Sequence, residues 1–204
     1  LIIIDEQHKF GVNQRKRLSD KGGNDCDVLL MTATPIPRTL TMTIYGDMDL
    51  SIIREKPKNR KIIKTYSKLE SKIDDVIKIN KKEINSANQI FWVCPLIEES
   101  KKLDHTSAIQ KFEYLKKLFP KQVSILHGKL DINEKDEILK KFLNKEFKIL
   151  VSTTIIEVGI DFPNANVIII ENANKFGLSQ LHQLRGRVGR GENEATCILM
   201  FKSN

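Results

Sequence analysis

The feature that most constrains the fold is an alternation of short apolar runs with amphipathic segments. Several runs are continuously apolar, which is typical of parallel strands buried on both faces of a sheet. We predict strands over Leu1–Asp5, Val28–Thr32, Ile62–Tyr66, Ile90–Cys94, Val123–Leu126, Ile149–Ser152, Val167–Glu171 and Cys197–Phe201. Strands that alternate with helices at this spacing favour an α/β fold, a parallel sheet covered by helices.

Apolar side chains recur at helical spacing between the strands, and they predict helices within 69–84, 109–119 and 138–142. Asp131 and Glu134 have the spacing of a capping box, which would begin the third helix.

The stretch EKPKNRK begins at Glu55, is charged and lacks apolar periodicity. We interpret 55–60 as a linker between 1–54, the end of one domain, and 61–204, a complete domain. A length of 204 residues fits one α/β domain and a remnant of another.

Composition favours a polyanionic partner, because 34 Lys and Arg against 26 Asp and Glu leave a formal charge of +8. The three cysteines are far apart and form no C-x-x-C pair, so neither a zinc site nor a disulfide framework is supported. No apolar run reaches the roughly 18 residues of a membrane span, and no signal peptide is visible. We therefore expect a cytoplasmic protein with no membrane partner.

The string LIIIDEQH at 1–8 delivers two adjacent carboxylates at the carboxyl end of a predicted strand, where open α/β sheets bind ligands. Asp5 is placed to hold Mg²⁺ through water, and Glu6 to orient or deprotonate a water that attacks a γ-phosphate. His8 can sense the nucleotide. The alternative is a strand end followed by a solvated polar loop.

The string MTATPIPRTL at 31–40 follows the second predicted strand, so Thr32 and Thr34 lie at the same edge as the carboxylates. Their hydroxyls can link the carboxylate site to a neighbouring surface. Arg38 would begin a helix that faces a phosphate backbone. The alternative is a rigid loop with one exposed arginine.

Two further strings follow strands of the predicted second domain. In LHGKL at 126–130, His127 can meet phosphates and Gly128 allows close backbone approach, although an ordinary strand-end turn would look the same.

In STTIIEVGIDFPNA at 152–165, Thr153 and Thr154 are placed to bind backbone phosphate. Gly159 permits a tight turn and Asp161 can accept a hydrogen bond from a ribose hydroxyl. The alternative is again a simple turn.

The most informative string is QLHQLRGRVGRG at 180–191, in which Gly186 and Gly189 separate three arginines. Each glycine costs a helix about 1 kcal/mol relative to alanine, so a purely structural helix has no reason to contain them. We interpret the glycines as allowing close approach to a partner. Arg187 and Arg190 would then stabilise charge on a γ-phosphate. The alternative is a basic helix that binds nucleic acid.

In this order, the DEQH box, TATPIPRTL, TTIIEVGIDFPNA and QLRGRVGR resemble the motifs of the superfamily-two DNA helicases. The resemblance covers almost the whole chain. Three stretches are most similar to bacterial branch-migration helicases: FWVCPLIEES at 91–100, GDMDLSII at 46–53, and residues 171–191. The transcription-repair coupling translocases are the alternative within the family.

The resemblance implies RecA-like domains of the P-loop NTPase class, with ATP and Mg²⁺ bound between two such domains. It implies that Asp5 and Glu6 form the magnesium and water-activating pair, and that Thr32 and Thr34 couple ATP state to DNA grip. It places Gly159, Asp161 and Gln183 at the nucleotide, with Arg187 and Arg190 at the phosphates. The implied partner is branched DNA at stalled forks and Holliday junctions, or duplex DNA, bound by a monomeric protein.

The string G-x-x-x-x-G-K-[ST] does not occur in the chain. We therefore expect an incomplete helicase core that needs the missing N-terminal half of the same protein, and little or no ATPase activity from the chain alone. A nucleic-acid-binding module and a non-catalytic interaction domain are the alternatives. A binding module has no use for Asp5 and Glu6, whose charge repels DNA, and this favours an enzyme.

Overall fold

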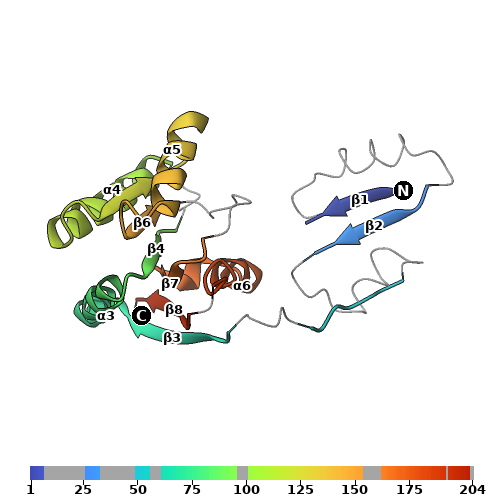
Figure 1. Cartoon of the computed structure of the whole chain (residues 1–204), viewed down its shortest axis with the longest axis horizontal. Helices are drawn as coiled ribbons and strands as arrows, with labels where there is room; N and C mark the ends of the chain where they lie inside the picture. The colour runs from blue at the N-terminus through green and yellow to red at the C-terminus, as the bar shows by residue number, and fades with distance from the viewer. Residues whose placement is uncertain are drawn as a thin grey trace. The chain divides into compact units, whose positions relative to one another are not determined.

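The computed structural model describes residues 1–6, 26–32, 49–55, 61–95, 101–153, 162–191 and 193–202. The chain divides into two compact units, Leu1–Arg54 and Glu55–Asn204 (Figure 1).

The described part of the first unit contains two strands, β1 (Ile2–Asp5) and β2 (Val28–Met31). They pair in parallel, with Ile2 opposite Val28 and Asp5 opposite Met31. Their carboxyl ends therefore lie at the same edge.

The second unit is built on a six-stranded parallel sheet in the order β3-β8-β7-β4-β6-β5. The strands are β3 (Ile63–Leu69), β4 (Gln89–Val93), β5 (Val123–Leu126), β6 (Ile149–Ser152), β7 (Ala165–Ile170) and β8 (Ala195–Phe201). The helices are η2 (Glu70–Lys72), α3 (Ile73–Asn85), α4 (Lys101–Leu118), α5 (Ile132–Leu143), η3 (Ala173–Lys175) and α6 (Leu178–Arg185) (Figure 1). The predicted fold class, a parallel sheet flanked by helices, is confirmed.

Helices cover both faces of this sheet, and β4 shows why its strands are apolar throughout. Trp92 packs on the face that α3 and α4 cover. Phe91 packs on the opposite face, against side chains of α5 and α6 that include Phe142 and Leu184. Every residue of β4 is buried, as expected for a parallel strand with helices on both sides.

The predicted strands are all present. Two match their predicted ranges, and the others have ends displaced by one to three residues. One helix boundary was wrong: Leu69 ends β3, where it pairs with Phe201, and α3 begins at Ile73. The capping box is confirmed. The Glu134 N–H donates to the Asp131 carboxylate at 2.8 Å, and the Asp131 N–H donates to the Glu134 carboxylate at 3.0 Å.

The neighbouring strands β4 and β7 mark a change of direction in the sheet. β4 is followed by α4 on one face, whereas β7 is followed by α6 on the other. Such a switch point, at the carboxyl ends of the strands, is where open α/β sheets place ligand sites. Among the described residues, no helix combines the length and apolar character needed to cross a membrane.

Candidate functional site

The carboxyl ends of β1 and β2 bring three of the predicted site residues together. Asp5 ends β1, and Thr32 directly follows β2. Glu6 is tied to β2 by its backbone N–H, which donates to the Met31 carbonyl at 2.9 Å. The Thr32 hydroxyl donates to the Glu6 carboxylate at 3.3 Å. One carboxylate and one hydroxyl of this edge are thus in direct contact.

Glu6 adopts a left-handed backbone conformation, with φ of 50°. This conformation costs a residue with a side chain roughly 1–2 kcal/mol, and such strain is found where a functional group must be held in one direction.

The carboxylate edge suits a hard cation. Asp5 is exposed and Glu6 is partly exposed, so both carboxylates are accessible. Mg²⁺ is usually held by one or two carboxylates while it keeps several waters and binds substrate phosphates. No group of three or more His, Cys, Asp and Glu side chains forms a cage among the described residues. Two carboxylates at one strand edge are a donor set of the kind that Mg²⁺ uses.

The carboxyl ends of β5 and β6 bring together His127, Gly128 and Thr153. The two strands are parallel neighbours, with Leu126 opposite Ser152, and the Thr153 N–H donates to the Leu126 carbonyl at 3.3 Å. A Cβ added at Gly128 would meet no atom within 4 Å. The position that a side chain at residue 128 would occupy is therefore open, and a DNA contact there stays a prediction.

The arginine segment, residues 183–191, begins in the last turn of α6. The helix ends at Arg185, and Gly186 is its C-cap. The Arg185 guanidinium contacts the His182 ring at 3.2 Å, and Arg190 Nε donates to the Gly186 carbonyl at 3.4 Å. Arg190 is exposed, whereas Gln183 and Arg187 are half-buried.

Two glycines fix this segment against its own domain. Gly189 has φ of 70°, and a Cβ there would lie 2.9 Å from the Cβ of Ala195. Its N–H donates to the Ala165 carbonyl at 3.3 Å. A Cβ at Gly191 would collide with the Pro163 carbonyl. The predicted role of Gly189 was contact with a partner, whereas the structure gives it a role inside the fold, because β8 leaves no room for a side chain.

Six of the predicted site residues lie outside the described residues, and the structure does not place them: His8, Thr34, Arg38, Thr154, Gly159 and Asp161.

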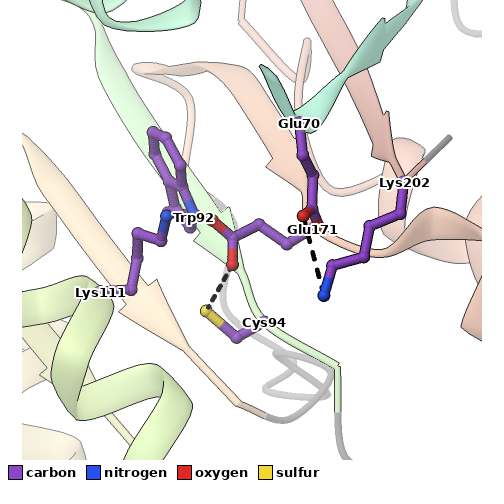
Figure 2. Close-up of polar contacts among 6 residues, drawn as sticks. All are labelled: Glu70, Trp92, Cys94, Lys111, Glu171 and Lys202. Carbon is purple, nitrogen blue, oxygen red and sulfur yellow. Dashed lines mark hydrogen bonds and ion pairs between the residues drawn. The ribbon is translucent and has the colours of Figure 1, made fainter. Parts of the chain in front are cut away.

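The structure adds a polar cluster that sequence analysis missed, at the carboxyl ends of β4 and β7 (Figure 2). The Glu171 carboxylate accepts a hydrogen bond from the Trp92 indole at 2.9 Å and pairs with Lys111 Nζ at 2.7 Å. The Cys94 thiol lies 3.7 Å from the same carboxylate. Burial and the Glu171 charge raise the pKa of Cys94 well above its ordinary value. The only signal in the sequence is a charged residue that follows an apolar strand.

Comparison with known proteins identifies the family. The model of the helicase conserved C-terminal domain matches residues 70–192. The chain is 52% identical over 202 residues to the ATP-dependent DNA helicase RecG of Bacillus subtilis, covering 98% of this chain and 30% of that protein. It is 50% identical to RecG of Thermotoga maritima, covering 98% of this chain and 26% of that protein. The chain therefore spans less than a third of these relatives.

Solved structures agree with the sequence comparison. A structure of RecG bound to a three-way DNA junction matches with a TM-score of 0.74 and 43% identity, covering 99% of this chain and 26% of that chain. S. cerevisiae Dbp5 bound to RNA matches with a TM-score of 0.68 at 20% identity, covering 99% of this chain and 53% of that chain, and supports the fold alone. The predicted resemblance to bacterial DNA helicases is confirmed.

Proposed function

Because the chain belongs to the family of helicase conserved C-terminal domains, we propose that it is part of an ATP-dependent DNA helicase that remodels branched DNA. The observation that carries the proposal is 52% identity to RecG over 98% of the chain. The likeness to RecG bound to a three-way junction supports branched DNA as the substrate. In this proposal, the activity belongs to a longer protein, and this chain contributes the carboxylate pair and the arginine segment to it.

In this proposal, Arg187 and Arg190 face the γ-phosphate of ATP and stabilise the charge that develops during hydrolysis. The glycine contacts support this role. Gly189 and Gly191 fix the backbone beside both arginines, so that the guanidinium groups reach the phosphate from a preorganised segment.

The proposed magnesium site is the carboxylate edge of the first unit. Asp5 would hold Mg²⁺ through water, and Glu6 would orient the attacking water. When bound, the ion neutralises charge on the phosphates. The Thr32 hydroxyl donates a hydrogen bond to the Glu6 carboxylate. This contact supports a coupling role for Thr32, because a movement of the carboxylate during ATP hydrolysis would act directly on Thr32.

The remaining proposed roles rest on family resemblance. Gly159, Asp161 and Gln183 would contact the nucleotide, and Thr34 would act with Thr32. Proposed DNA contacts are Arg38, His127, Gly128, Thr153 and Thr154.

The test measures ATP turnover by the full-length helicase that we propose contains this chain. Turnover is compared without DNA, with linear duplex and with forked DNA, in the wild type, Arg190→Ala and Arg185→Ala. We expect forks to stimulate turnover most, and Arg190→Ala to lower kcat by roughly 10³-fold or more. Arg185→Ala is the matched control, because Arg185 contacts His182 within α6.

Each alternative has its own outcome. Equal stimulation by linear and forked DNA would favour a coupling-type translocase. DNA binding without turnover would favour a binding module, and equal losses in both arginine variants would remove the specific role of Arg190.

A further inference from the structure

Glu171 is the centre of a buried polar cluster that the proposed function does not use. Only 13% of its side chain is exposed, and 22% of the side chain of its partner Lys111. Lys111 Nζ also lies 5.4 Å from the ring centroids of Trp92 and Tyr114. The cluster therefore combines an ion pair and an indole hydrogen bond at the Glu171 carboxylate with cation–π contacts of Lys111. Figure 2 draws Glu171 with Trp92, Cys94 and Lys111.

The cluster joins elements that are distant in the sequence. Trp92 and Cys94 come from β4 and its end, Lys111 comes from α4, and Glu171 directly follows β7. The Glu171 N–H also donates to the Val93 carbonyl at 2.9 Å. Glu171 thus links the carboxyl ends of β4 and β7 through both its backbone and its side chain. These ends form the switch point of the sheet.

Stability alone does not explain a carboxylate at this position. Apolar side chains of similar size are often as stabilising as a buried ion pair, because ions lose their hydration on burial. A carboxylate that accepts from several donors also fixes the positions of those donors, since all of its hydrogen bonds form only when the donors are correctly placed. An open surface depression lined in part by Lys111, Tyr114 and Glu171 adjoins the cluster.

The chain turns sharply after Glu171. Asn172 has φ of 47° and ψ of 48°, and η3 and then α6 follow, leading into the arginine segment. Residues 91–93 of β4 belong to the helicase-like string FWVCPLIEES at 91–100. The position of Glu171 therefore bears on two motif-carrying segments at once.

We propose that Glu171 is a positioning residue for ATP turnover, which holds the arginine segment in register with the end of β4. This inference rests on the proposed helicase function. Glu171 acts through the backbone of β7 and α6.

A spectroscopic test reports on the cluster directly. Trp92 is the single tryptophan of the chain, and its indole donates to Glu171. In the 204-residue chain, we expect Glu171→Ala to shift tryptophan emission to longer wavelength, because water enters beside the indole. Glu171→Gln keeps an acceptor and should shift it less. Glu194→Gln is the matched control, since it removes the exposed ion pair with Lys64 and should leave emission unchanged.

A kinetic test then separates positioning from folding, in the full-length helicase with forked DNA. We expect Glu171→Ala to lower kcat by roughly 10- to 100-fold, as small displacements of reacting groups do. KM for ATP should stay within about twofold, because in this proposal Glu171 places the arginine segment and does not itself bind ATP. Glu171→Gln, which is nearly isosteric, should fall between the wild type and Glu171→Ala, and it preserves the test if the alanine variant does not fold.

The two failures are distinguishable. Wild-type kcat in a folded Glu171→Ala protein, or a loss confined to KM, would overturn the inference and leave the proposed function intact. Absence of DNA-stimulated turnover in both the wild type and Glu194→Gln would overturn the proposed function, and the inference with it.

Discussion

Gly189 and Gly128 were both predicted to allow a partner to approach the backbone closely, yet their surroundings in the structure are opposite. Gly189 has positive φ and faces Ala195 at 2.9 Å, whereas Gly128 faces open space. We predict that Gly189→Ala lowers the free energy of unfolding by about 1–3 kcal/mol. Gly128→Ala should change it by less than about 0.5 kcal/mol. Urea unfolding of both variants checks this, and equal losses would show that the Gly189 backbone is not constrained as described.

The cysteines give a second prediction, on thiol reactivity. Burial raises the pKa of the Cys197 thiol to about 11, and burial with the Glu171 charge raises that of Cys94. Cys26 is partly exposed. Because the thiolate is the reactive form, we expect a thiol reagent at pH 8 to modify Cys26 quickly and the other two only on unfolding.

The same pKa shifts make stability depend on pH. Unfolded thiols lose their protons near pH 8.5, about the usual cysteine pKa, while the folded thiols keep theirs. The unfolded state then binds fewer protons, so stability falls as pH rises above that value. Rapid labelling of all three cysteines in the folded chain would contradict this account.

At the scale of elements, α5 is the helix whose start was predicted in most detail. Both hydrogen bonds of its capping box are present. We predict that Asp131→Ala lowers the free energy of unfolding by about 0.5–2 kcal/mol. Asp136→Ala, an exposed change inside the same helix, is the control and should have little effect. Equal values for the two variants would mean that the cap does not stabilise α5.

The central strands were predictable because burial on both faces favours mostly apolar residues, as in β4, β6 and β7. β5 and β6 match their predicted ranges. Helix and strand boundaries were less predictable, since Leu69 suits either element and its pairing with Phe201 decides between them. The Glu171 cluster was not predictable, because its partners come from three separate segments and no local pattern relates them.

The candidate site, too, was predictable in part. Asp5 and Thr32 were placed at one edge by the parallel-strand rule alone. The contact between Thr32 and Glu6 could not be predicted, because it joins residues 26 positions apart, and no local pattern indicated the left-handed backbone of Glu6. The role of Gly189 was misread because its neighbour Ala195 belongs to the next strand.

At the scale of the whole molecule, the sequence carries the carboxylate pair and the arginine segment but no phosphate-binding G-x-x-x-x-G-K-[ST] string. We predict that the 204-residue chain alone shows no ATP turnover above background, because its sequence lacks the glycine-rich string whose backbone cradles nucleotide phosphates. A phosphate-release assay with the wild type and Glu6→Gln checks this. Turnover that is present in the wild-type chain and lost in Glu6→Gln would contradict the prediction.

The measurement that tests the central claim most directly is ATP-dependent strand separation of a labelled three-way junction by the full-length helicase. We predict that the wild type separates the strands and that Arg190→Ala binds the junction but leaves it intact. Arg185→Ala should separate the strands like the wild type. Failure of the wild type to separate the junction, while it hydrolyses ATP equally well on linear duplex, would contradict a role in remodelling branched DNA.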